Sequence, residues 1–144
     1  MPALPPRSNS SLLVRTDFTS NDAWQQVSGE AQWENEDGFR AHVEPVSDPA
    51  FDRTGWEEVK AAVPAGDRKA MVLFVADSTA LTAPDNPVLV VDLFHGRPPF
   101  RVIVSELWAI ENNLNLANMD WEEFAEAVGD DGIFRGFSGS SQGG

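Results

Sequence analysis

Two aspartates occupy matching places in the sequence, each directly after an apolar segment and each followed by hydroxyl side chains. Asp17 stands in "TDFTS" and Asp77 stands in "ADSTA". If the two apolar segments form neighbouring parallel strands, both carboxylates lie over the same edge of the sheet. Two close carboxylates can bind Mg²⁺ or share a proton, which raises the pKa of one of them. The competing interpretation is that each aspartate caps the turn after its strand.

The histidines and a group of arginines form a second set of candidates. His42 is on the polar side of an alternating segment, where it could act as a base or be an exposed strand residue. His95 stands in a turn close to Arg97 and Arg101. Together with Arg135 these side chains could form a basic spot that binds a carboxylate or a phosphate. The alternative is that the arginines pair with nearby Asp and Glu side chains.

Four asparagines follow Glu111 within "ENNLNLAN". Asparagine is a poor helix former, because its side chain competes for backbone hydrogen bonds. The segment is therefore predicted to end one helix and begin the next, since Asn tolerates the left-handed conformation at a helix end. The other interpretation is a ligand site in which Glu111 and four amides point into a pocket. Those amides belong to Asn112, Asn113, Asn115 and Asn118.

The strands and helices that would position these residues can be read from the apolar pattern. Strands are predicted over 11–16, 39–44, 70–76, 86–94 and 100–104. Helix-start patterns begin at Thr19 and Thr54, and two further helical patterns follow Ser105 and Asp120. Strands that alternate with helices imply a mostly parallel sheet. We expect a three-layer α/β domain with about five strands, strand order 2-1-3, an antiparallel terminal hairpin and then two helices.

The chain of 144 residues is long enough for one domain with a sizeable core. We expect that domain at 11–137, after a disordered arm at 1–10 and before a flexible tail at 138–144. The start has no apolar signal region, and no apolar run approaches the length of a membrane span. A cytoplasmic protein is therefore expected.

The net charge of -13 makes nucleic acid and anionic membranes unfavourable partners. The acidic excess is concentrated between Val102 and Phe134, a segment with eight acidic residues and no Lys or Arg. This segment predicts either a well-solvated helical face or a docking surface for a basic protein.

The sequence also excludes several kinds of site. Cysteine is absent, which excludes disulfides, thiolate nucleophiles and zinc sites built on cysteine. There is no nucleophile-elbow, phosphate-loop, HExxH or EF-hand pattern. We therefore expect no cofactor, and no metal unless Asp17 and Asp77 bind one.

These observations favour a non-catalytic interaction or ligand-binding module of an immunity or regulatory type. It would use its acidic helical face for a basic protein partner, or bind a small polar ligand. The alternative is a small cofactor-free enzyme that acts on a secondary metabolite. Its candidate acid and base groups are Asp17, Asp77, Glu111 and His42.

Several stretches together resemble a family of small acidic proteins. They are "SLLVRTDF", "FRAHVEPVSDPAFD", "PVLVVDL", "FRVIVSELWAIENNLNLANMDWEEFAEAV" and "DGIFRGF". The family is found mainly in actinobacteria and is catalogued as a domain of unknown function, and "ENNLNLANMD" at 111–120 is the most distinctive stretch. The resemblance covers residues 11–137 and implies no activity, cofactor or catalytic residue.

Overall fold

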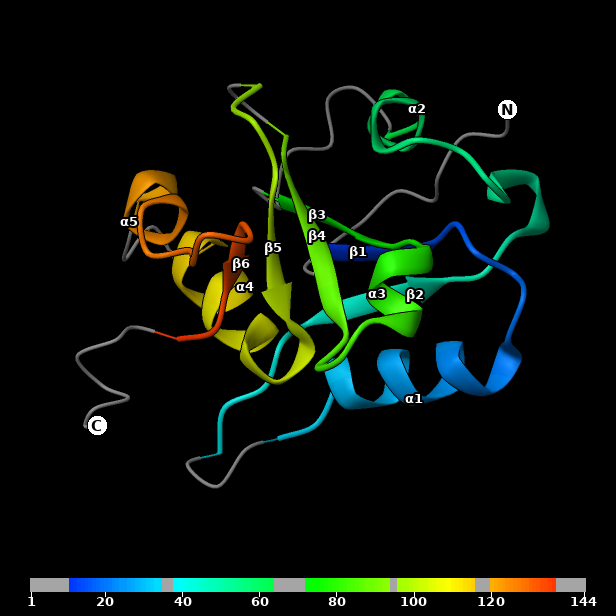
Figure 1. Cartoon of the computed structure of the whole chain (residues 1–144), viewed down its shortest axis with the longest axis horizontal. Helices are drawn as coiled ribbons and strands as arrows, with labels where there is room; N and C mark the ends of the chain where they lie inside the picture. The colour runs from blue at the N-terminus through cyan, green and yellow to red at the C-terminus, as the bar shows by residue number, and fades with distance from the viewer. Residues whose placement is uncertain (1–10, 35–37, 64–71, 94–95, 116–119, 137–144) are drawn as a thin grey trace.

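The computed structural model describes residues 11–34, 38–63, 72–93, 96–115 and 120–136 (Figure 1). The arm expected at 1–10 and the tail expected at 138–144 lie outside these residues. In chain order, with η for a 3₁₀ turn, the elements are β1 (Ser11–Arg15), α1 (Asn21–Ala31), β2 (Val43–Val46), η1 (Pro49–Phe51), α2 (Trp56–Ala61), β3 (Val72–Ala76), α3 (Ser78–Thr82), β4 (Pro87–Asp92), β5 (Phe100–Ile103), η2 (Val104–Glu106), α4 (Leu107–Asn115), α5 (Trp121–Ala125) and β6 (Ile133–Phe134). In the described part of the chain, no helix has the length and apolar character needed to cross a membrane.

One mostly parallel sheet organises the domain, with strand order β2-β1-β3-β4-β5-β6. β1 pairs in parallel with β2 and β3, whereas β4 runs antiparallel to β3 and to β5. The predicted order 2-1-3 and the antiparallel hairpin are therefore confirmed. The chain leaves β1 toward one edge of the sheet and leaves β3 toward the other. The gap between the carboxyl ends of these two strands is thus a topological switch point.

The central strands are buried on both faces, as their uninterrupted apolar sequences predict. Every residue of β1, β3 and β4 is buried. Successive side chains alternate between the faces, so Leu13 and Phe74 belong to one core cluster. Leu12, Val14 and Leu73 belong to the other. Burial of apolar surface on both sides keeps β1 and β3 inside the sheet.

Helices cover the two faces of the sheet unequally. α1, α4 and α5 place apolar side chains in the core cluster that contains Leu13 and Phe74. η1 and α2 contribute Phe51 and Val59 to the cluster on the other face. Figure 1 shows α1 and α2 on opposite sides of the sheet. That placement is expected because the crossovers β1-α1-β2 and β2-α2-β3 run in opposite directions along the sheet.

Two helices begin one residue later than their sequence patterns predict. Ser20, rather than Thr19, caps α1 with its side chain. Gly55, rather than Thr54, precedes α2, because the hydroxyl of Thr54 donates to the carbonyl of Phe51 (2.8 Å). Neighbouring residues with similar capping ability cannot be ranked from sequence when tertiary contacts decide between them.

Three further elements differ from the prediction of about five strands. β2 begins at Val43 instead of residue 39, and the N–H of His42 donates to Glu111 (2.9 Å) rather than to a strand. α3 follows Asp77 between β3 and β4, where no helix was predicted, and its five residues are too few for a helical period. β6 adds a sixth strand of two residues, parallel to β5. β2 is an edge strand and carries Pro45.

Leu13→Ala should lower the free energy of unfolding by about 2–5 kcal/mol, because truncation of a buried leucine leaves a cavity. Leu13 is 0 % exposed, whereas Trp33 is 70 % exposed. Trp33→Ala removes more atoms, yet it should change the free energy by no more than about 0.5 kcal/mol. Chemical denaturation followed by far-ultraviolet circular dichroism measures both changes. Equal losses for the two variants would contradict this assignment of the core.

Candidate functional site

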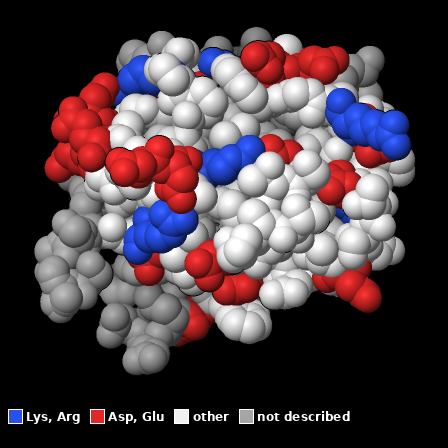
Figure 2. Space-filling model, viewed as in Figure 1, with Lys and Arg blue, Asp and Glu red and all other residues white. Residues whose placement is uncertain are grey.

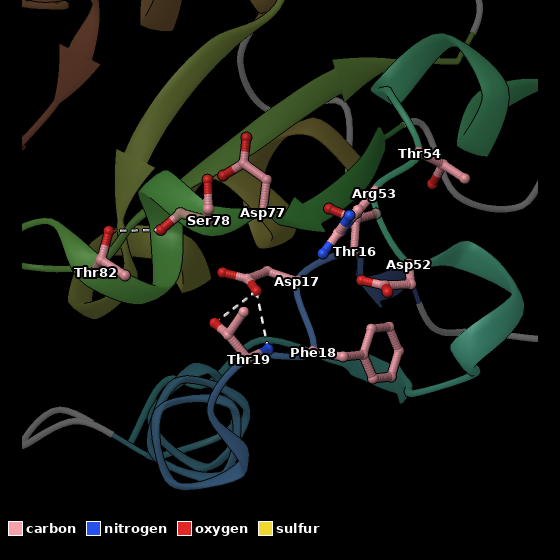
Figure 3. A pocket seen from close by; sticks show the side chains of 10 residues that line it. All are labelled: Thr16, Asp17, Phe18, Thr19, Asp52, Arg53, Thr54, Asp77, Ser78 and Thr82. Carbon is pink, nitrogen blue, oxygen red and sulfur yellow. Dashed lines mark hydrogen bonds between the residues drawn. The ribbon is translucent and has the colours of Figure 1, made fainter.

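A cleft of about 620 Å³ opens over the carboxyl ends of β1 and β3 (Figure 3). Three segments form it: the residues after β1, the turn before α2, and Asp77 with the short helix α3. The residues that line it have polar side chains except for Phe18, and they are Thr16, Asp17, Phe18, Thr19, Asp52, Arg53, Thr54, Asp77, Ser78 and Thr82. The cleft therefore occupies the switch point, where ligands of open α/β sheets bind.

Asp17 lies in the middle of the cleft as drawn in Figure 3. Its Oδ1 accepts hydrogen bonds from the N–H (3.0 Å) and the hydroxyl (2.8 Å) of Thr19, which fix the turn that leads into α1. Its Oδ2 accepts no hydrogen bond from the residues that the structure describes. The predicted turn-capping role is therefore present, and one carboxylate oxygen remains available to a ligand.

Both oxygens of Asp77 are engaged. Oδ1 caps α3 by accepting from the N–H of Ala80 (3.0 Å) and also accepts from Arg101 (3.0 Å). Oδ2 accepts from the second terminal nitrogen of Arg101 (2.7 Å), which makes the ion pair bidentate. Arg101 donates further to the carbonyl of Pro87 (2.9 Å). Asp77 thus caps the following turn, and Arg101 pairs with an acid, as the alternative interpretation of the arginines predicts.

The structure brings Asp17 and Asp77 to one cleft, as the predicted strand order requires. The positive charge of Arg101 nevertheless compensates the negative charge of Asp77 in their ion pair. Among the described residues, no group of three or more Asp, Glu or His side chains lies close enough to hold a metal ion. The magnesium site on these two aspartates stays a prediction, and Asp17 would supply most of its free charge because Arg101 already pairs with Asp77.

Arg53 has a backbone conformation that is uncommon for a residue with a Cβ atom (φ 64°). The left-handed region costs a residue other than glycine about 1–2 kcal/mol. The N–H of Arg53 donates to the carbonyl of Thr16 at the end of β1 (2.8 Å), which holds the turn beside the cleft. Arg53 is exposed, and within the described part of the chain its guanidinium forms no ion pair. It therefore supplies positive charge to the cleft.

Arg15 is buried (3 % exposed) at the end of β1 and has no carboxylate partner among the described residues. Its guanidinium donates to the carbonyl of Asp17 (2.8 Å) and to the side chains of Asn21 (2.9 Å) and Ser47 (3.3 Å). It also lies 4.2 Å from the ring centre of Phe18, which is a cation–π contact. Arg15 thereby joins the segment after β1 to the start of α1 and to the segment after β2.

The predicted site around Glu111 lies at the other end of β1 from the cleft. Glu111 is buried (3 % exposed), and its Oε1 accepts from the N–H of His42 (2.9 Å) and the amide of Asn112 (3.0 Å). Its Oε2 accepts from the hydroxyl of Ser11 (3.4 Å). The His42 Nδ1 atom is 3.9 Å from Oε1, and the imidazole is 62 % exposed. Glu111 therefore joins α4 to the starts of β1 and β2, and it is not part of a solvated acidic face.

Of the other predicted polar residues in this group, the structure describes the side chain of Asn113 but not those of Asn115, Asn118 and His95. The amide of Asn113 donates to the carbonyl of Ala109, one turn earlier in α4 (2.9 Å). α4 ends at Asn115, which confirms the predicted helix end, and the side chain of Asn115 is not described. Asn118 and His95 lie outside the described residues. The ligand-binding role of the asparagines stays a prediction.

Ion pairs and burial perturb the acids near the C-terminus. The pKa of Asp131 is lowered, chiefly because Arg135 donates a hydrogen bond to it. The pKa of Glu122 is lowered for the same reason by Arg97. Burial raises the pKa of Glu106. Arg135 therefore pairs with an acid, as Arg97 and Arg101 do. The three arginines do not form a single basic spot.

Sequence reasoning missed Arg15, Asp52 and Arg53. A usable signal was present, because the rule that selected Asp17 and Asp77 applies equally to β2. β2 is parallel to β1, so its carboxyl end reaches the same edge of the sheet, and the polar residues after it lie beside the cleft.

Comparison with family models gives one match, over residues 10–137, to a family described as a domain of unknown function, DUF6924. The chain belongs to the DUF6924 family. The resemblance to a domain of unknown function over residues 11–137 is therefore confirmed, whereas the actinobacterial distribution and the signature stretch stay predictions. The search of curated proteins gave no match. All residues that line the cleft, and those that join at Glu111, fall within the DUF6924 match.

Arg101→Met should destabilise this DUF6924 domain by about 1–3 kcal/mol, because it leaves a partly buried carboxylate without its charged donor. Arg135→Met is the matched control, since the Arg135–Asp131 pair is more exposed than the Arg101–Asp77 pair. Its cost should stay below about 1 kcal/mol. Equilibrium urea unfolding at low salt compares the two. A larger cost for Arg135→Met would show that the Asp77 pair does not stabilise the cleft.

Proposed function

We propose that this protein is a non-catalytic module that binds a small zwitterionic ligand in the cleft over β1 and β3. The observation that carries the proposal is Arg53, a strained arginine that is held beside the cleft and has no ion-pair partner among the described residues. Strained backbone persists only where surrounding contacts enforce it, and it concentrates at functional sites. The N–H of Arg53 bonded to Thr16 is such a contact.

The charges around the cleft suit a molecule that carries both an anionic and a cationic group. Arg53 can bind a carboxylate through two parallel hydrogen bonds. Asp17 has an oxygen without a described partner, and Asp52 lines the same cleft, so an ammonium group can lie against them. The hydroxyl groups of the lining can bind the polar body of the ligand. A cleft of about 620 Å³ lies within the range of small-molecule sites.

Binding is favoured over catalysis by the arrangement of the layers and because two of the four candidate acid and base groups, Asp77 and Glu111, are already engaged. We infer a three-layer arrangement, supported by the two core clusters on opposite faces of the sheet. In it the cleft opens at the end of the sheet, between the layers.

A general acid or base needs an oxygen free to exchange a proton with a substrate. Both oxygens of Asp77 accept hydrogen bonds from Arg101, and Glu111 is buried in its own network.

Free amino acids should raise the melting temperature of the protein, because a ligand that binds only the native state stabilises it. The amides of the same amino acids lack the carboxylate, and their N-acetyl derivatives lack the ammonium group. Both analogues should give smaller shifts. Differential scanning fluorimetry over this panel, with and without Mg²⁺, measures the effect. The ligand should be recovered unchanged, whereas turnover would favour the alternative of a cofactor-free enzyme.

Arg53→Ala should weaken binding of the best ligand from that panel by about 10-fold or more, the effect of losing a charged hydrogen bond. Arg40→Ala is the control, because Arg40 is exposed and does not line the cleft. Isothermal titration calorimetry compares the two variants with the unchanged protein. No binding by any member of the panel, or equal losses for both variants, would contradict the proposal.

The acidic surface near the C-terminus supports a second candidate function, the docking of a basic protein. Figure 2 shows acidic side chains gathered over α5. Six of the eight acidic residues between Val102 and Phe134 are exposed, namely Asp120, Glu122, Glu123, Glu126, Asp130 and Asp131. Such a surface steers a basic partner by long-range attraction.

The double change Glu126→Gln and Asp130→Asn should release a basic partner that the unchanged protein retains at low salt, since screening removes attraction between exposed charges. Asp22→Asn with Glu57→Gln removes the same charge from exposed positions elsewhere and should leave retention intact. Affinity purification from the native host, with quantitative mass spectrometry, compares the three proteins. Loss of the partner from both double variants would assign retention to net charge alone.

A further inference from the structure

Two exposed aromatic side chains and a third, half-buried one form a cluster on the surface. Trp33 and Phe39, which are 70 % and 49 % exposed, are the large hydrophobic residues of the described chain that are exposed. The ring of Phe39 stacks on Trp108, with ring centres 5.3 Å apart and an interplanar angle of 10°. Trp33 and Trp108 line the same small cavity. Exposed apolar surface gathered in one place, rather than scattered, marks an interaction site.

The cavity beside these rings is acidic. Its volume is about 130 Å³, and it is lined by Glu30, Ala31, Trp33, Glu34, Val104, Ser105 and Trp108. Glu30 and Glu34 come from the end of α1 and the turn after it. No Lys or Arg of the described chain is part of the lining.

The fold gives no reason for Trp33 to be an aromatic residue. Its N–H donates to the carbonyl of Glu30 in the turn that ends α1, and any residue other than proline can supply this bond. With 70 % of its surface exposed, the indole contributes little to the core. The aromatic face is therefore free to serve an interaction.

We propose that Trp33, Trp108, Glu30 and Glu34 form a docking site for one arginine side chain of a basic partner protein. Aromatic faces attract cations, and carboxylates beside them neutralise the charge. A cavity of about 130 Å³ is smaller than the sites that hold whole small molecules, which span roughly 300–1,000 Å³. The site therefore fits the tip of a side chain that projects from a larger surface.

Arginine fits this site better than lysine does. A planar guanidinium stacks on an indole and can bond two carboxylates through separate edges. Lysine offers a compact, strongly hydrated ammonium that gains less from stacking. The site uses different residues from the cleft and from the acidic surface over α5, so its test does not depend on either proposed function.

The test titrates the full chain, labelled with ¹⁵N, with the capped peptide acetyl-Gly-Arg-Gly-amide at low salt. The indole N–H signals of Trp33 and Trp108 should shift together, whereas the signals of the buried Trp24 and Trp121 should not. The same peptide with lysine should cause smaller shifts, and the peptide with citrulline, which has the shape of arginine without its charge, the smallest. Shifts that are equal for arginine and citrulline would overturn the proposal, as would the absence of any shift.

Two charge-matched variants complete the test. The double variant Glu30→Gln, Glu34→Gln should bind the arginine peptide with roughly 5-fold lower affinity, which is the combined effect of losing two partly exposed ion pairs. Glu126→Gln with Asp130→Asn removes the same charge from the acidic surface over α5 and should change the affinity by less than about 2-fold. Equal losses for the two variants would assign the shifts to overall charge and overturn the site. A lysine peptide that binds as well as the arginine peptide would overturn the choice of arginine.

Discussion

The bidentate ion pair between Asp77 and Arg101 is the interaction on which the cleft depends. Asp77 directly follows β3 and caps α3, whereas Arg101 belongs to β5, with β4 between the two strands. One carboxylate therefore fixes the position of a helix and of two strands that do not touch each other. A partly buried carboxylate needs such a donor, because an uncompensated charge in that position destabilises the fold. The same pair removes Asp77 from chemistry and leaves Asp17 and Arg53 as the groups that can meet a ligand.

A buried acid organises the opposite end of the sheet. Glu111 accepts hydrogen bonds from Ser11 at the start of β1 and from His42 just before β2. The apolar core between the two ends does not by itself fix the register of β1 and β3, because these strands are buried on both faces and a slipped strand would still bury apolar side chains. Polar contacts at both ends of β1 supply that information. Arg15 adds to it by joining the segments after β1 and β2.

The sequence predicts the centre of this fold better than its periphery. The buried strands β1, β3 and β4 have continuous apolar sequences, and alternation with helices is enough to predict the parallel strands in the order 2-1-3. α3 and β6 are too short for any periodicity, and the start of β2 depends on a carboxylate distant in sequence. The same limit applies to the cleft. Asp17 and Asp77 follow recognisable strands, whereas the position of Arg53 depends on a hydrogen bond to Thr16 and that of Arg101 on pairing across the sheet.

The two edges of the sheet bear on how the protein behaves at high concentration. A sheet with exposed edges can recruit another strand through its unpaired N–H and C=O groups and so grow into aggregates. β2 at one edge contains Pro45, which has no N–H to donate, and Glu44, whose charge repels a second copy of the same edge. β6 at the other edge has two residues and offers little backbone for pairing. The most apolar strands of the chain are thereby enclosed between edges that resist polymerisation.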